Sequence, residues 1–312
     1  MMDINIQDLS VTFVTNQKKQ TVLKNANLFL PQGKVTAIVG ESGSGKSILG
    51  SAVAGLLDIR ATVTGHILYG GADILSLNEK EMNLIRGQKI CWMAQDPVSA
   101  MDPLQKVGKF VTEILNYRKK QSSGQILETG LQQLKRFGLD QYTETVYQSY
   151  PHALSGGMAQ RVLAAAMTVE KPEWLIADEP TKGLDALARK QVYLNLQQLT
   201  QEENTGMLLI THDLRLAENL SDYIAVMYAG EILEYARTEE FFSNPVHPYS
   251  RGLIEAQPER GMKPIPGEDP EILMTEEGCV FSSRCSDFCD SCRNHQVMKE
   301  KDSHFARCWR YG

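Results

Sequence analysis

The sequence predicts an α/β protein whose core is a mostly parallel, doubly wound sheet, and three observations support this. Short apolar runs alternate with longer helical segments over most of the chain, which is the pattern of βαβ units. A glycine-rich segment, GESGSGKS at 40–47, lies between a predicted strand and a predicted helix. Composition changes after about residue 257, where QPERGMKPIPGEDP contains four prolines. We therefore expect a large domain over 1–257 and a small one over 258–312.

Composition excludes several classes of protein. The chain has 312 residues, of which 42% are hydrophobic and 22% charged, so it can bury a core. A net charge of −6 argues against binding nucleic acid through a basic face. No apolar run approaches the ~20 residues that cross a bilayer. The first residues, MMDINIQD, carry neither a basic nor an apolar leader segment, so we expect a protein of the cytoplasm.

The first quarter of the chain predicts the sheet elements around the glycine-rich segment. Partial period-two alternation at 3–13 and 21–30 predicts two strands of a small antiparallel sheet. The β-branched, apolar run KVTAIV at 34–39 predicts a buried strand, and a helix should follow over 46–57. Segment 62–75 predicts a further strand and turn.

The middle of the chain predicts helices first and then alternating elements. Residues 79–86 and 104–149 have helical patterns, and another helix should begin near Gly157. A third buried strand is expected at 174–177. The elements predicted after it are a helix at 186–203, a strand at 207–210, a short helix at 213–220 and a strand at 223–227.

The segment 40–47 fits GxxxxGK[ST], the pattern of a phosphate-binding loop. Glycines let backbone N–H groups curl around phosphate oxygens, and the start of the following helix adds the positive end of its dipole. Lys46 would contact the β- and γ-phosphates, and Ser47 would hold Mg²⁺. The alternative is a glycine turn before a helix. The expected phosphate-binding residues are Gly40, Ser42, Gly43, Gly45, Lys46 and Ser47.

Two carboxylates follow the apolar strand at 174–177. Acidic residues at the ends of strands are common, but in a chain that also has a phosphate loop the pair specifically indicates a nucleotide site. Asp178 would bind Mg²⁺, directly or through water. Glu179 would polarise the attacking water as general base.

The segment LSGGMAQ at 154–160 resembles the signature of ATP-binding subunits of ABC transporters. This resemblance implies a P-loop NTPase with a RecA-like core, an antiparallel β subdomain and a helical subdomain at about 97–170. It also implies that two subunits pair head to tail, each enclosing the other's ATP. Ser155, Gly156 and Gly157 would then contact the nucleotide of the partner subunit from the start of a helix.

Other motifs of this family occur in the expected order. Gln95 in MAQDP resembles the Q-loop residue that contacts Mg²⁺ and water, and Asp185 in GLD resembles the D-loop residue. Gly183 stands where alanine is commoner in the family. His212 in ITHD resembles the switch histidine, which is expected to contact the γ-phosphate. Phe13 is the candidate for stacking on adenine, with a packed core phenylalanine as the alternative.

The C-terminal part narrows the resemblance to the oligopeptide/dipeptide importer group. NPVHPYSR at 244–251 is similar to NP-x-HPY-[ST]-R, PGEDP at 266–270 to GEPP, and GCVFSSRC at 278–285 to GCxFxxRC. Nickel or metal-chelate importers share this type of ATPase, and a non-transport ABC ATPase is the rival class. The resemblance implies a second ATPase subunit, usually a paralogue, two transmembrane permeases and an extracytoplasmic solute-binding protein. The chain would lie at the cytoplasmic face of the membrane.

Five of the six cysteines lie in the last 34 residues of the chain. Some members of the peptide-importer group carry an iron–sulfur cluster on a set spaced like Cys279, Cys285, Cys292 and Cys308, so the resemblance implies such a cluster here. Four thiolates suit [4Fe–4S] or Zn²⁺, and unliganded thiols are the third reading. Cys289 is additional to the pattern, and Cys91 should be a core residue. A cluster so far along the chain from the ATP motifs is expected to be structural.

Overall fold

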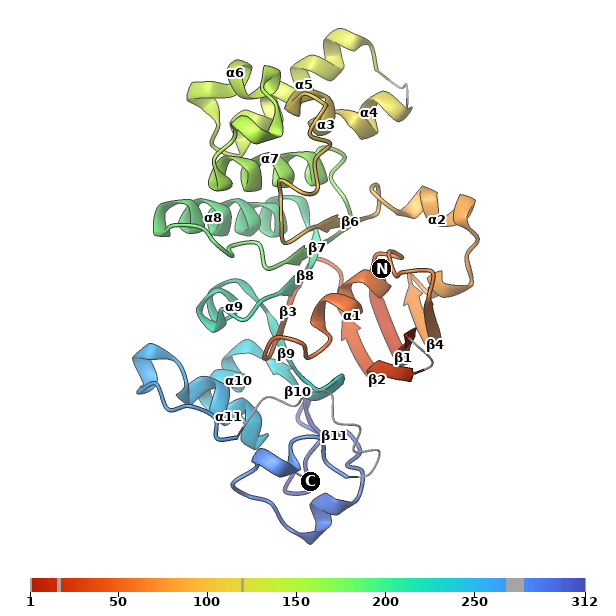
Figure 1. Cartoon of the computed structure of the whole chain (residues 1–312), viewed down its shortest axis with the longest axis vertical. Coiled ribbons are helices and arrows are strands. Elements are labelled where there is room, and N and C mark those ends of the chain that lie inside the picture. The colour runs from red at the N-terminus through yellow and green to blue at the C-terminus, as the bar shows by residue number, and fades with distance from the viewer. Residues whose placement is uncertain (1, 16–17, 119–120, 268–277, 312) are drawn as a thin grey trace. The chain divides into compact units, whose positions relative to one another are not determined.

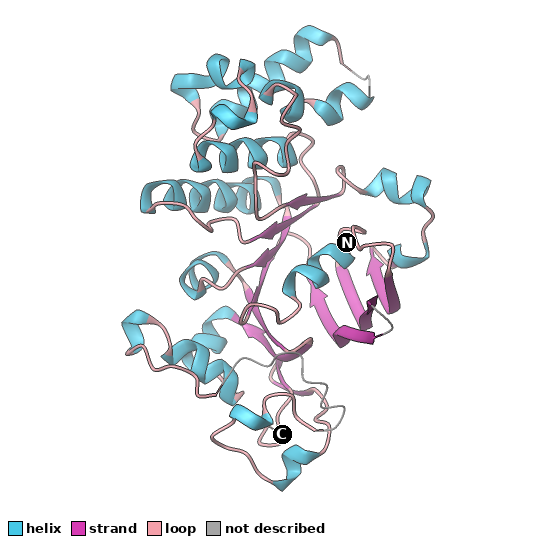
Figure 2. Cartoon of the chain, viewed as in Figure 1, coloured by secondary structure: helices cyan, strands magenta, loops and turns pink. Residues whose placement is uncertain are grey.

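The computed structural model describes residues 2–15, 18–118, 121–267 and 278–311 (Figure 1). The chain divides into two compact units, which are described separately below. The first unit combines residues Met1–Ser76 with Leu208–Gly312, and the second comprises Leu77–Met207. Each unit contains both helices and strands (Figure 2). Among the described residues, no helix is long and apolar enough to cross a bilayer.

An antiparallel sheet forms one part of the first unit, as the alternating apolar pattern predicts. Its strands, in the order β2-β1-β4-β5, are β2 (Lys18–Leu30), β1 (Ile4–Thr15), β4 (Ala61–Tyr69) and β5 (Ala72–Asp73). Asp8 has a φ of 48° at a register shift, so Leu9 is buried like Ile4 and Ile6 before it. This irregularity explains why the alternation in the sequence is only partial.

A second sheet of the first unit carries the predicted buried strands. In spatial order its strands are β11 (Lys299–Lys301), β12 (His304–Ala306), β10 (Glu231–Arg237), β9 (Tyr223–Tyr228), β3 (Val35–Val39) and β8 (Gly206–Ile210). β3 pairs with β9 in parallel, whereas β9 with β10, β10 with β12 and β11 with β12 pair antiparallel. The sheet is therefore mixed: β3 and β9 pair in parallel, as the alternating elements predict, and the antiparallel pairs are those that β10, β11 and β12 make.

The helices of the first unit are α1 (Lys46–Val53), α9 (Leu214–Leu220), α10 (Thr238–Ser243) and α11 (Pro248–Glu255). α1 is shorter than the predicted 46–57. Gly55 has a φ of 65° directly after the C-cap residue Ala54, and such a left-handed glycine ends a helix.

The second unit contains two strands, β6 (Ile90–Met93) and β7 (Trp174–Asp178), which pair in parallel with Met93 opposite Ala177. Its helices are α2 (Glu79–Ile85), α3 (Val107–Val111), α4 (Glu113–Arg118), α5 (Ser123–Arg136), α6 (Thr143–Gln148), α7 (Gly156–Thr168) and α8 (Ala186–Glu203). Buried apolar side chains of α3, α5 and α7, among them Val111, Leu134 and Leu163, form the interior of the helical part.

The C-terminal segment is attached to the sheet of the first unit through β12, where Ala306 pairs with Glu234 of β10. Its side chains Phe281, Cys292 and Cys308 are buried. An independent small C-terminal domain is therefore not confirmed. Residues 268–270 of the predicted PGEDP motif lie outside the described residues, whereas Pro266 and Gly267 lie within them. Single 3₁₀ turns lie at Ile74–Ser76, Asp140–Tyr142, Pro151–Ala153, Pro258–Arg260, Ser282–Arg284 and Asp290–Arg293.

Candidate functional site

The predicted phosphate loop connects β3 to α1 in the first unit, between Val39 and Lys46. Two of its glycines are required by the backbone. Gly40 has a φ of 150°, and a Cβ there would lie 2.1 Å from the carbonyl oxygen of Met227. Gly45 is the N-cap of α1 with a φ of 101°, a conformation that side chains rarely allow. The loop therefore depends on glycine for its shape, as the motif predicts.

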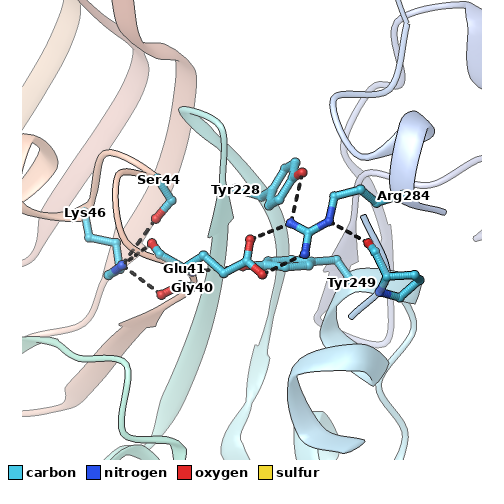
Figure 3. A network of polar contacts seen from close by, with 8 residues as sticks. Gly40, Glu41, Ser44, Lys46, Tyr228, Tyr249 and Arg284 are labelled. Atoms are coloured by element: carbon cyan, nitrogen blue, oxygen red, sulfur yellow. Dashed lines mark hydrogen bonds and ion pairs between the residues drawn. The ribbon is translucent and has the colours of Figure 1, made fainter. Parts of the chain in front are cut away.

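The side chain of Lys46 lies inside this loop and is buried (Figure 3). Its Nζ donates to the carbonyl oxygens of Gly40 and Glu41, at 2.8 and 2.7 Å, and to Ser44 Oγ at 3.3 Å. Ser47, in the first turn of α1, is exposed. The loop thus presents an ammonium group, an exposed hydroxyl and the N-terminal end of a helix, which is the chemistry that binds phosphate.

His212 lies at the same edge of the sheet as the loop. Thr211 N donates to Ile38 O at 3.1 Å, so the chain leaves β8 beside the end of β3. His212 itself is exposed. Asp213 caps α9 by accepting from Leu216 N at 3.0 Å, which fixes the residue that follows the histidine. Within the first unit, His212 and the loop therefore follow the ends of two neighbouring strands, β8 and β3. Phe13 lies in β1 opposite Gln20 and is half-buried.

The acidic pair of the second unit lies at the end of β7. Asp178 is the last residue of the strand and is buried. Glu179 has a φ of 48°, a strained conformation for a glutamate, and such strain is concentrated at functional sites. Gln95 follows β6, the parallel neighbour of β7, by two residues and is exposed. Because parallel strands end at one edge of a sheet, Gln95 and the two carboxylates lie at the same edge.

The signature segment forms the start of α7, where Ser155 is the N-cap and accepts from Met158 N at 3.4 Å. Ser155 and Gly156 are exposed. A Cβ at Gly156 would meet nothing within 4 Å, whereas one at Gly157 would lie 3.0 Å from Ala188 Cβ. Packing within the described residues therefore does not require glycine at 156. Asp185 caps α8 by accepting from Ala188 N at 2.9 Å and is exposed.

The cysteines do not form the predicted metal centre in the structure. Among the residues that the structure describes, no three or more His, Cys, Asp or Glu side chains form a group that could hold a metal ion. Cys289 is not one of the four predicted ligands, but its Sγ lies 3.9 Å from the Sγ of Cys292. Burial, and to a smaller extent the nearby Cys292, Cys285 and Cys308, raise the pKa of Cys279 to about 11.

Cys91 is buried in β6, and burial raises the pKa of its thiol to about 12. This confirms the prediction that it is a core residue.

One residue of the site cannot be recognised from the phosphate-loop motif. The motif leaves position 41 variable, but the structure places the side chain of Glu41 against Arg284 and its backbone against Tyr249. The available signal was the presence of both partners in the two C-terminal motifs, HPY and GCVFSSRC.

Two family models match the chain. The one described as "ABC transporter" matches residues 23–182, and "Oligopeptide/dipeptide transporter, C-terminal region" matches 233–292. The oligopeptide transport ATP-binding protein OppD of Salmonella typhimurium is 37% identical over 296 residues, covering 93% of this chain and 88% of the relative. The dipeptide transport ATP-binding protein DppD of Lactococcus lactis is 35% identical over 318 residues, with 98% and 90% covered.

Solved structures of similar fold include the dimeric structure of MJ0796, a bacterial ABC transporter cassette. It has a TM-score of 0.69 and 27% identity, covering 75% of this chain and 98% of that one. A post-hydrolysis state of the same cassette, bound to ADP and Pi, has a TM-score of 0.68 and 26% identity, with the same shares covered.

Proposed function

Because this chain belongs to the ABC transporter family of ATP-binding subunits, we propose that it is the ATPase that powers an importer of oligopeptides or dipeptides. The observation that carries this proposal is the pair of matches on one chain, the ATPase region at 23–182 and the peptide-transporter C-terminal region at 233–292. Relatives named for oligopeptide and dipeptide transport, at 35–37% identity over most of the chain, support the cargo class.

The phosphate loop of the first unit would bind the β- and γ-phosphates of ATP. Lys46 is already held inside the loop, and no side-chain hydrogen bond from the N-cap residue Gly45 caps the N–H groups at the start of α1. Ser47 and Asp178 would hold Mg²⁺, since hydroxyl and carboxylate oxygens are the ligands this ion prefers. Mg²⁺, when bound, neutralises charge on the phosphates. Phe13 would stack on the adenine.

Hydrolysis would use Glu179, Gln95 and His212. Glu179 accepts a proton from the attacking water as general base, and the left-handed backbone at this residue supports a functional role. Gln95 orients that water and contacts Mg²⁺, and the exposed imidazole of His212 contacts the γ-phosphate.

The signature would serve a second ATPase subunit, a paralogue in the proposed complex. Ser155 and Gly156 are exposed, and the open space at Gly156 is explained if a nucleotide bound to the partner approaches there. Gly157 and the D-loop residue Asp185 would complete the contact with the same nucleotide. The head-to-tail arrangement would then enclose ATP between the phosphate loop of one subunit and the signature of the other.

Two transmembrane permeases and an extracytoplasmic solute-binding protein would complete the importer, with this chain bound peripherally at the cytoplasmic face of the membrane. Exposed apolar side chains follow Gln95 in the loop before α3, and they support a contact with the permeases. Val98 is 42% and Leu104 85% exposed. We assign 1–257 to the ATP-binding domain, with its helical subdomain at about 97–170, and 258–312 to the C-terminal segment.

We also propose a [4Fe–4S] cluster, with Zn²⁺ as the alternative, on Cys279, Cys285, Cys292 and Cys308. The support is the donor chemistry, since four thiols gathered in one short segment suit soft metals. The arrangement described above does not form a metal-holding group, so no step of hydrolysis is assigned to a cluster. Iron, sulfide and zinc analysis of protein purified without oxygen tests this, and metal-free protein with an ordered C-terminal segment would contradict it.

Reconstitution tests the function. The chain, its co-encoded ATPase, permeases and binding protein are assembled in liposomes, and ATP-dependent uptake of labelled dipeptides, longer peptides and Ni²⁺ is measured. We expect ATP-dependent uptake of peptides by the wild type, and we expect Lys46→Ala to lower this uptake at least tenfold. Uptake of Ni²⁺ but of no peptide would contradict the cargo, and ATP-independent uptake would contradict the ATPase role.

A further inference from the structure

The carboxylate of Glu41 is held by an arginine far along the chain. Arg284 Nη1 donates to Glu41 Oε2 at 2.7 Å, and Nη2 donates to Oε1 at 3.0 Å, so the pair is bidentate (Figure 3). The side chains are only 5% and 22% exposed, respectively. Bidentate, charge-assisted pairs of this kind fix geometry as well as charge.

Arg284 is itself held in place by its surroundings. Its Nε donates to the carbonyl oxygen of Pro266 at 2.9 Å, and Nη1 also contacts Tyr228 Oη at 3.4 Å. The guanidinium carbon lies 5.8 Å from the ring centre of Tyr228 and 6.0 Å from that of Phe281. The arginine is thus pre-organised by residues of β9 and of the C-terminal segment.

The second C-terminal motif reaches the same residue of the loop. Tyr249, the tyrosine of HPY, accepts a hydrogen bond from Glu41 N at 2.9 Å through its hydroxyl oxygen. Its ring centre lies 4.7 Å from that of Tyr228 and 5.2 Å from that of Phe281. Both the backbone and the side chain of Glu41 therefore contact residues outside the phosphate loop.

Glu41, which these contacts hold, is also one of the loop residues that bind Lys46. The carbonyl oxygen of Glu41 accepts from Lys46 Nζ at 2.7 Å, so Glu41 links Arg284 to the ammonium group (Figure 3). The ligand of such a loop is a polyanion, which an unbalanced carboxylate on the loop would repel. Arg284 supplies the balancing charge. Residues of the C-terminal segment thus contact the phosphate loop, although they lie far from it along the chain.

We propose that Arg284 is a positioning residue of the phosphate loop, acting through Glu41, so that the C-terminal segment is required for tight ATP binding. The proposal rests on the proposed function, namely that the loop at 40–47 binds ATP. Tyr249 acts with Arg284, because its hydroxyl group fixes the backbone of Glu41.

The test measures the affinity of the full-length chain for a fluorescent ATP analogue, together with its thermal unfolding. Arg284→Met should weaken binding about tenfold, because it removes a charge-assisted pair and leaves the negative charge of Glu41 unbalanced on the phosphate loop. In a Glu41→Gln background the same substitution should have less than a threefold effect, because the two residues act as one unit. Arg284→Lys, which keeps the charge but not the bidentate geometry, should lie between wild type and Arg284→Met.

Arg293→Met is the matched control, since Arg293 pairs with Asp290 at 3.1 Å in the same segment and is 71% exposed. It should leave ATP affinity unchanged. Equal loss of affinity from Arg284→Met in both backgrounds, or no loss in either, would overturn the proposal. If Arg284→Met does not fold, wild-type affinity in Arg284→Lys would overturn it, and weaker affinity would support it. Unchanged affinity in Lys46→Ala would instead overturn the ATP site itself.

Discussion

Glu234 is the residue whose replacement should destabilise the C-terminal half of the first unit most clearly. Its carboxylate is fully buried in β10. It accepts from His247 N at 2.7 Å and Val246 N at 2.9 Å, and it contacts His304 Nε2 at 2.8 Å. One side chain therefore joins β10 to the segment before α11 and to β12.

The cost of Glu234→Ala follows from these contacts. A buried and a part-buried backbone N–H group lose their acceptor, at about 1–3 kcal/mol each, and His304 loses its partner as well. We expect the free energy of unfolding to fall by about 4 kcal/mol. Glu234→Gln keeps one amide oxygen as an acceptor and should cost about half as much.

Urea unfolding and amide hydrogen exchange together measure this effect. The amides of Val246 and His247 should exchange much faster in Glu234→Ala than in the wild type, while amides of β7 keep their protection. Glu239→Ala serves as the control, because this residue lies in the same half of the unit at the start of α10. A loss below about 1 kcal/mol, with both amides still protected, would refute the reasoning.

Three further predictions concern catalysis, the partner subunit and pH. Glu179→Gln should keep ATP binding but lose most turnover, because an amide cannot take the proton from water; near-normal ATPase activity of the assembled complex would contradict this role. Ser155→Arg should leave ATP binding to the isolated subunit intact and block pairing of the subunits, in contrast to Lys46→Ala; equal loss of affinity in both would contradict the assignment of the signature to the partner's nucleotide. Burial lowers the pKa of His247 from 6.5 to about 4. Below pH 6.5 the unfolded chain therefore takes up a proton that the folded chain does not, and the free energy of unfolding should fall by about 3 kcal/mol between pH 7 and pH 4. His247→Asn should flatten this part of the pH profile of thermal unfolding, and a parallel decline in both proteins would contradict the expectation.

Local sequence signals predicted the elements around the nucleotide site well. Helix α8 has the predicted bounds because Asp185 caps its start and Asn204, with a φ of 54°, follows its end. The strand–loop–helix unit at 35–53 follows from an apolar run, a glycine motif and helical periodicity, all of which act over a few residues.

Features that depend on distant contacts were not predictable from local pattern. β10 was missed because Glu231 and Glu234 interrupt its apolar residues, although both are buried in the structure. The pairing of Arg284 with Glu41 joins residues 243 positions apart, and no periodicity specifies such a contact. For the cysteines, the resemblance to the peptide-importer group and the spacing predicted a metal centre, whereas the described residues form no metal-holding group.

The rate of ATP hydrolysis by the assembled importer tests the central claim most directly. The rate is measured with the binding protein empty and then loaded with a peptide, in wild type and in Glu179→Gln. We expect the loaded binding protein to raise the wild-type rate severalfold and Glu179→Gln to remove most of the hydrolysis in both states. A rate that does not respond to peptide, or that stays near the wild-type value in Glu179→Gln, would contradict the claim that this chain couples ATP hydrolysis to peptide import.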